Sequence, residues 1–126
     1  MPKTVPGGPG LEPGPYPFSK VVEANGFVFL GGQVGDTPGG HGAVPGGIEA
    51  ETRAMLDNVG RLLKAVGLDY RDVVKCTIYL RDFDDFAAMN AVYRTYFPTE
   101  PPTRATVGVT ALAEDFRVEI EVLAAR

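Results

Sequence analysis

The chain of 126 residues is poor in residues that bind metals or form disulfides, with one cysteine, one histidine and no tryptophan. A disulfide needs two cysteines, so none forms within the chain, and one Cys with one His cannot supply an ordinary structural zinc site. Cys76 lies in the apolar run 73–80, which predicts a buried, reduced thiol and a cytoplasmic protein. His41 lies in a loop rich in Gly and Pro, where we expect it to be exposed rather than catalytic.

The sequence also lacks a long apolar run, a signal-peptide pattern and an excess of basic residues. The longest apolar stretches are far too short to span a membrane, so no membrane association is expected. Twelve Lys and Arg against sixteen Asp and Glu give a net charge of −4. This balance makes nucleic-acid binding unlikely but allows one local basic site. The glycine-rich segments carry neither a GxGxxG pattern nor a P-loop lysine, so nucleotide binding has no support.

The residues that are present favour one folded domain over residues 1–126. A hydrophobic content of 44% and a charged content of 22% are ordinary for a globular protein of this length. Residues 1–17 are dense in Pro and Gly, which excludes a regular helix and permits at best a short edge strand.

The remaining segments alternate between strand and helix patterns. Asn25-Gly26 between two apolar runs predicts a β-hairpin, and Asp84 or Asp85 could cap the second helix. The predicted elements are a hairpin over 21–30, a loop over 36–47, a helix over 48–66 that ends at Gly67, a strand over 73–80, a helix ending near Pro98, and strands over 103–109 and 116–122. This order predicts an α+β fold, with a twisted β-sheet and two helices packed on one face.

Polar side chains alternate with apolar ones in both C-terminal strands. Arg104 and Thr106 share one face of the first strand, and Glu119 and Glu121 share one face of the second. The apolar residues on the opposite faces are Ala105, Val107 and Val109 in the first strand and Val118, Ile120 and Val122 in the second. The pattern predicts that Arg104 and Glu119 both lie on the sheet face that does not form the core. A guanidinium and a carboxylate placed there could bind a substrate carboxylate and activate a water, with Glu121 as the alternative base.

The predicted central strand carries bulky groups on both faces. Thr77 and Tyr79 share one face, opposite Cys76, Ile78 and Leu80. A face that mixes aromatic groups with single opposite charges is typical of a subunit interface, so we expect a homo-oligomer with sites where subunits meet.

Several motifs in order resemble the Rid family, the reactive-intermediate imine and enamine deaminases also called YjgF-type proteins. The resemblance covers the chain from about Phe18 to the C-terminus. It rests on Asn25-Gly26-Phe27-Val28-Phe29-Leu30-Gly31-Gly32-Gln33-Val34, Glu51-Thr52-Arg53 with Leu56-Asp57-Asn58, Val73-Val74-Lys75, Asp85-Phe86 with Asn90 and Tyr93, and Pro101-Pro102-Thr103-Arg104 followed by Val118-Glu119-Ile120-Glu121. Each motif alone is weak, and the full set in order is specific.

The resemblance implies a chorismate-mutase-like fold, a homotrimer with three clefts between subunits, and no cofactor. It implies hydrolysis of reactive 2-imino or enamino acids to 2-keto acids and ammonia. Arg104 would bind the substrate carboxylate, Glu119 would position water, and the Thr106 backbone would help to hold the substrate. The positions that would line the cleft are Gly32, Tyr79 and Asn90, with Phe18 and Gly31 at two further substrate-binding positions.

Three positions depart from the best-known deaminase pattern. Phe18 stands where a tyrosine is usual, Gly31 where a serine is usual and Thr106 where a cysteine is usual. The guanidinium and the carboxylate remain, so the departures bear on which imine is preferred. Two alternatives stay open: a non-catalytic or regulatory trimer that binds small carboxylates, and, less favoured by the acidic composition, an RNA-directed ribonuclease or translation inhibitor.

Overall fold

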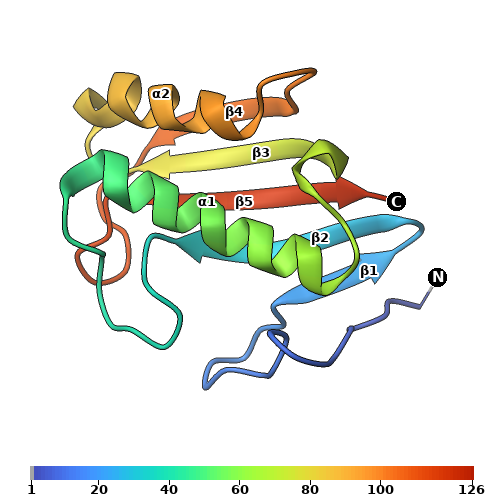
Figure 1. Ribbon diagram of the computed structural model, residues 1–126. Coiled ribbons are helices and arrows are strands. Elements are labelled where there is room, and N and C mark those ends of the chain that lie inside the picture. Colours follow the sequence, from blue (N-terminus) through green and yellow to red (C-terminus); the bar gives the residue numbers. More distant parts are fainter. Residues whose placement is uncertain (1) are drawn as a thin grey trace.

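A computed structural model describes residues 2–126 as one five-stranded sheet with two helices on the same face (Figure 1). The elements are β1 (Val21–Ala24), β2 (Phe27–Val34), α1 (Gly47–Ala65), β3 (Val73–Leu80), α2 (Phe86–Tyr96), β4 (Thr103–Gly108) and β5 (Val118–Ala125), with short 3-10 helices η1 (Tyr70–Asp72) and η2 (Phe83–Asp85). The predicted α+β architecture is confirmed.

The strand order β1-β2-β5-β3-β4 places the last strand in the middle of the sheet. β5 pairs antiparallel with both β2 and β3, whereas β3 and β4 are parallel and joined through α2. A parallel pair needs a crossover connection, and α2 supplies it. Consequently Glu119 lies on a central strand, and Arg104 lies on β4 at the edge of the sheet.

The local turn chemistry follows the sequence. Asn25 and Gly26 both have positive φ, 54° and 81°, as the tight hairpin turn between β1 and β2 requires. Past the end of α1, Gly67 has φ 78°, and its N–H donates to the carbonyl of Lys64 at 3.0 Å. The Leu68 N–H donates to the Leu63 carbonyl at 2.8 Å, which completes a Schellman cap.

The start of α2 differs from the prediction. Neither Asp84 nor Asp85 caps it through a side-chain hydrogen bond; the carboxylate of Asp82 instead accepts the Asp84 N–H at 2.9 Å and caps η2. The chain enters α2 through this 3-10 turn, so the capping role moves back to the first aspartate of the segment.

The proline- and glycine-rich N-terminal segment joins the sheet at one point. Thr4 and Glu23 exchange two backbone hydrogen bonds, at 2.9 and 2.8 Å, and Leu11 is buried against the core. The segment therefore forms an isolated β-bridge beside β1 rather than an extended strand. No helix in residues 2–126 is long and apolar enough to cross a membrane.

The core fills the space between the helices and one face of the sheet. Cys76, Ile78 and Ile120 are fully buried there, together with Met55 and Leu63 of α1. The other face carries no helix and exposes large apolar side chains, which are Phe27, Phe29, Val74 and Val107, each 40–47% exposed. Such a face is unusual for a chain that works alone.

Candidate functional site at the sheet edge and open face

Arg104 lies on the helix-covered face of the sheet, and this corrects the expectation that it shares a face with Glu119. It pairs with the fully buried Cys76 on β3, and its guanidinium carbon lies 4.6 Å from the centre of the Tyr93 ring and 5.7 Å from that of Phe86. The apolar residue expected inward, Val107, is 40% exposed on the other face. The long arginine stem packs under α2 and its cation stacks on aromatic rings, so the polar residue takes the covered side of this edge strand.

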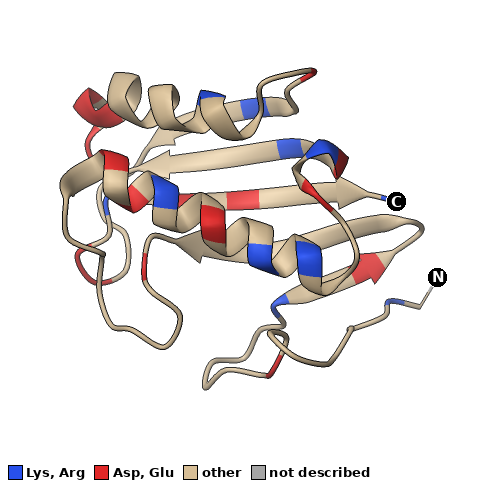
Figure 2. Ribbon diagram, in the orientation of Figure 1, with Lys and Arg blue, Asp and Glu red and all other residues tan. Residues whose placement is uncertain are grey.

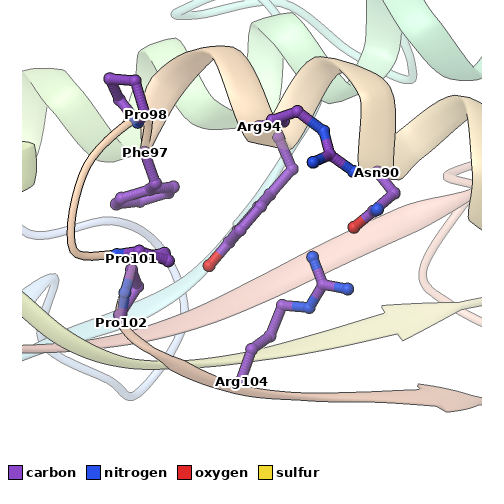
Figure 3. A pocket seen from close by; sticks show the side chains of 8 residues that line it. Asn90, Arg94, Phe97, Pro98, Pro101, Pro102 and Arg104 are labelled. Carbon is purple, nitrogen blue, oxygen red and sulfur yellow. The ribbon is translucent and has the colours of Figure 1, made fainter.

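A cavity of about 330 Å³ opens between α2 and β4 around Arg104. Asn90 of α2 and Arg104 of β4 point toward one another across it, and Arg94 lies along α2 beside Asn90 at its border (Figure 3). Its remaining lining residues are Tyr93, Phe97, Pro98, Pro101 and Pro102. Asn90, one of the positions expected to line the cleft, therefore shares this cavity with Arg104. The prolines and aromatic rings make the other walls stiff and apolar.

Two buried hydroxyls near this cavity have no hydrogen-bond partner among residues 2–126. They are those of Tyr93, which is 6% exposed and lines the cavity, and of Thr106, two residues beyond Arg104 on the same face of β4. Burial raises the pKa of Tyr93 well above the usual tyrosine value, so its hydroxyl stays protonated and can donate. Burial likewise raises the pKa of Cys76 to about 11, which keeps this thiol neutral.

Glu119 lies on the open face of the sheet, opposite Tyr79 of β3 and Val34 of β2. A side chain at Gly32 would overlap its carboxylate, so this glycine leaves the space that the carboxylate occupies. Burial, and secondarily the charge of Glu121, raises the pKa of Glu119. A carboxylate with a raised pKa is a stronger base than an ordinary one, which suits proton abstraction from water.

Tyr79 and Glu121 form a pair beside Glu119. The Tyr79 hydroxyl donates to Oε1 of Glu121 at 2.9 Å, and this bond to the carboxylate raises the pKa of Tyr79. Glu121 is therefore already partnered, and Glu119, which has no hydrogen bond to another side chain among residues 2–126, is the freer base.

Phe18 and Gly31 border the same end of β2. Phe18 is 65% exposed and lines a cavity of about 680 Å³ together with Gly32 and Gln33. Gly31 lies against the chain before β1, because a Cβ there would be 3.2 Å from the Ser19 carbonyl oxygen. The predicted residues therefore form two groups. Arg104, Thr106 and Asn90 lie at the β4 edge, and Glu119 lies on the open face with the residues around Gly32.

Within one chain the structure does not bring these two groups together. Arg104 and Glu119 sit on opposite faces of the sheet, on strands separated by β3. A site that uses both residues must therefore draw them from two copies of the chain.

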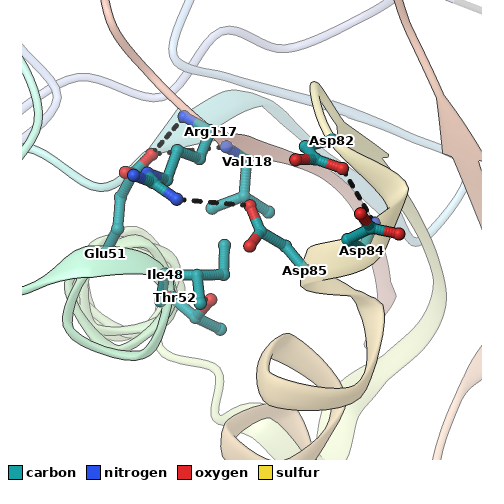
Figure 4. Close-up of polar contacts among 8 residues, drawn as sticks. All are labelled: Ile48, Glu51, Thr52, Asp82, Asp84, Asp85, Arg117 and Val118. Atoms are coloured by element: carbon teal, nitrogen blue, oxygen red, sulfur yellow. Dashed lines mark hydrogen bonds and ion pairs between the residues drawn. The ribbon is translucent and has the colours of Figure 1, made fainter.

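Glu51, which the motif Glu51-Thr52-Arg53 includes but to which no role was assigned, holds the start of the strand that carries Glu119. Glu51 of α1 is 2% exposed and accepts the backbone N–H groups of Arg117 at 2.6 Å and Val118 at 3.3 Å (Figure 4). The side chain of Arg117 approaches Asp85 at 3.7 Å, so the same point also meets the start of α2. Burial raises the pKa of Glu51.

Tyr93, which belongs to one of the family-like motifs, and Arg94 also line the cavity, although neither was predicted to do so. They lie three and four residues after Asn90, which on a helix places them on the same side. That spacing was the available signal. His41, by contrast, is exposed as predicted.

Comparison with known proteins places this geometry in a family. Residues 12–126 match a family described as Endoribonuclease L-PSP, and the chain is 43% identical over 108 residues to the mouse 2-iminobutanoate/2-iminopropanoate deaminase, covering 86% of this chain and 80% of that protein. The chain belongs to the Rid family. The predicted resemblance is thereby confirmed.

Solved structures of the Rid family share the fold over almost its whole length. The Rid protein YyfA of Yersinia pestis is 31% identical, with a TM-score of 0.89 over 99% of this chain and 100% of that one. Escherichia coli TdcF, solved with bound serine, is 32% identical, with a TM-score of 0.84 over 92% and 97% of the two chains. The α+β fold implied by the Rid resemblance is therefore confirmed.

Proposed function

We propose that this protein hydrolyses reactive 2-imino and enamino acids to 2-keto acids and ammonia. The observation that carries the proposal is the Arg104 guanidinium, which faces a cavity with Asn90 and has no ion-pair partner among residues 2–126. Rid-family relatives about 40% identical are named imine deaminases, and one solved relative holds an amino acid, serine. Both names concern ligands that carry a carboxylate.

In this proposal Arg104 binds the substrate carboxylate through two parallel hydrogen bonds, a geometry that lysine cannot reproduce. The Asn90 amide is a further donor of the same cavity. Thr106 adds backbone contacts on the strand that carries Arg104. A substrate held at one end in this way places its imine carbon at a fixed distance from the arginine, which lowers the entropic cost of reaction.

Glu119 acts as the base. It accepts a proton from a water whose oxygen bonds to the carbon of the protonated imine, which gives a carbinolamine. Glu119 then passes this proton to the nitrogen of the carbinolamine, the carbon–nitrogen bond breaks, and ammonia leaves. The hydroxyl proton goes to ammonia, so one imine and one water give one 2-keto acid and one ammonium ion. The imine carbon is electrophilic already, so no cofactor and no protein nucleophile are required.

The active assembly in this proposal is a homotrimer with sites between subunits. The support is that Arg104 and Glu119 lie on opposite faces of one chain and that the open sheet face exposes four large apolar side chains. A neighbour covering this face would bury those groups and bring its own β4 edge toward Glu119. Phe18, Gly31, Gly32 and Tyr79 would then line the Glu119 side of each cleft.

The test is direct. A pyridoxal-phosphate-dependent dehydratase acting on threonine releases 2-iminobutanoate, and the appearance of 2-oxobutanoate is followed with and without this protein. The proposal predicts faster keto-acid formation in proportion to protein added. A rate that stays at the spontaneous value while 2-oxobutanoate binds would support the alternative, a trimer that only binds small carboxylates.

An RNA-directed activity is the weaker alternative, although the family description names an endoribonuclease. Acidic and basic residues are interspersed along α1 rather than gathered by sign (Figure 2). The net charge is −4, so a broad phosphate-binding surface has little support. RNA binding that weakens steeply with added salt, together with RNA cleavage, would favour this alternative.

A further inference from the structure

The cavity around Arg104 contains a second guanidinium for which imine hydrolysis gives no role. Arg94 lies in the last turn of α2, one turn beyond Asn90, and lines the same cavity (Figure 3). The ion pairs within residues 2–126 join Arg117 to Asp85 and Arg126 to Glu23. Both cavity arginines are therefore without an acidic partner in the described chain.

Two cations that line one cavity and have no acidic partner in residues 2–126 give this cavity a positive charge that attracts an anionic ligand. A ligand with a single carboxylate neutralises one of them and leaves the other. The chain as a whole carries a net charge of −4, so this cavity is a local positive site on an acidic protein.

The size of the cavity also agrees with a ligand larger than a single carboxylate. A volume of about 330 Å³ lies within the range of small-molecule sites and leaves room beyond a single carboxylate.

We propose that the preferred substrates are 2-imino acids whose side chain carries a second carboxylate. Arg104 binds the carboxylate next to the imine carbon, and Arg94 binds the carboxylate of the side chain. This inference rests on the proposed function for its chemistry, but the binding preference can be measured separately on the 2-keto acid products.

Calorimetric titration with 2-oxoglutarate and 2-oxobutanoate tests the preference. We expect the protein to bind 2-oxoglutarate more tightly, and Arg94→Gln to reduce the ratio of the two affinities by about tenfold or more, as expected for losing a charge-assisted hydrogen bond. Arg53→Gln is the matched control: it makes the same charge change on α1, where Arg53 is exposed and lines no part of this cavity, and it should leave the ratio unchanged.

The outcomes separate this inference from the proposed function. Equal wild-type affinities for the two keto acids would overturn the preference, even if imines are hydrolysed. The preference would also be overturned if Arg94→Gln lowered thermal stability but kept the wild-type ratio of the two affinities. Arg94 would then only stabilise the C-terminus of α2. A preference for 2-oxoglutarate that depends on Arg94, in a protein that hydrolyses no imine, would support the dicarboxylate site and contradict the proposed reaction.

Discussion

At the scale of single residues, the aromatic surroundings of Arg104 position its guanidinium without pairing it with an acidic side chain of the described chain. Its guanidinium rests against the rings of Tyr93 and Phe86, at 4.6 and 5.7 Å from their centres, and makes no ion pair within the described chain. Stacking on rings fixes the plane of the guanidinium while leaving its N–H donors available. A carboxylate partner within the protein would instead compete with the ligand.

Replacing Arg104 with alanine should weaken 2-keto acid binding and abolish measurable imine hydrolysis. Charge-assisted hydrogen bonds contribute roughly 1.5–3 kcal/mol each, so losing a bidentate pair should weaken binding by about a hundredfold or more. Arg104→Lys should recover little, since an ammonium lacks the planar fork. Calorimetry with 2-oxobutanoate and the imine assay measure both effects, and unchanged affinity in Arg104→Ala would exclude the carboxylate role.

Replacing Glu119 with glutamine should separate binding from catalysis. The amide keeps the shape of the side chain but cannot accept a proton from water, so 2-keto acid affinity should persist while imine hydrolysis falls by about 10²–10⁴-fold. Steady-state kinetics beside calorimetry check the two halves of this prediction. Wild-type turnover in Glu119→Gln would move the base to Glu121.

The charge of Glu121 should be visible in the pH dependence of the reaction. Because Glu121 helps to raise the pKa of Glu119, Glu121→Gln should lower that pKa. The base works when deprotonated, so activity is lost as the pH falls through its pKa, and the acid limb of kcat/KM should shift to lower pH in the variant. Glu49→Gln, an exposed change of equal charge on α1, should leave the limb in place. An acid limb that is the same in all three proteins would rule out Glu119 as its origin.

The alternation of polar and apolar residues predicted the faces of β5 correctly and those of β4 wrongly. Alternation in β5 correctly put Val118, Ile120 and Val122 in the core and Glu119 on the open face. The same alternation gave the wrong faces for β4, which is an edge strand and is less completely buried than β5. A side chain as long as that of arginine can lie on the covered face there, because its apolar stem packs against aromatic rings while its charged end reaches the cavity. The alternation along a strand shows which residues share a face of the sheet. Which of the two faces is covered depends on where the helices pack.

At the scale of elements, Glu51 links α1 to the start of β5. Its carboxylate receives two backbone N–H groups just before Glu119, at 2.6 and 3.3 Å. These donors lie where β5 follows the preceding loop, and the side chain supplies an acceptor for both of them there. The helix thereby fixes where the strand with the proposed base begins.

Removing the Glu51 carboxylate should destabilise the fold. Glu51→Ala removes the acceptor of the buried Val118 N–H and of the partly buried Arg117 N–H, and an unsatisfied buried donor costs about 1–3 kcal/mol. Glu51→Gln keeps one acceptor oxygen in a side chain of the same size, so it should be clearly more stable than the alanine variant. Urea unfolding measures the difference. Equal stability of the two variants would mean that the hydrogen bonds contribute little.

The element boundaries were predictable wherever a turn or cap has a local chemical signature. The Asn25-Gly26 turn and the Gly67 cap both have the positive φ angles that their residue types favour. The entry to α2 was not predictable in the same way, because three aspartates in four residues could each cap and only the tertiary path selects Asp82. Insertion of β5 between β2 and β3 is likewise a tertiary choice that no local pattern encodes.

At the scale of the whole molecule, one chain provides two incomplete halves of the proposed site. Arg104 with its cavity lies beneath α2 at the edge of the sheet, and Glu119 lies on the uncovered face. Exposed apolar side chains on that face, including Phe29 and Val107, are the part of the surface that gains most from a neighbouring subunit. The proposed catalysis therefore depends on the assembly of several chains.

Mixing two inactive variants tests that claim most directly. Arg104→Ala and Glu119→Gln proteins are unfolded together in equal amounts and refolded, and imine hydrolysis is compared with each variant refolded alone. In a cyclic trimer, a cleft that takes Arg104 from one subunit and Glu119 from the next is intact with probability one half times one half, so activity should return to about one quarter of the wild-type value. A mixture that forms mixed oligomers yet stays as inactive as its components would contradict a site shared between subunits.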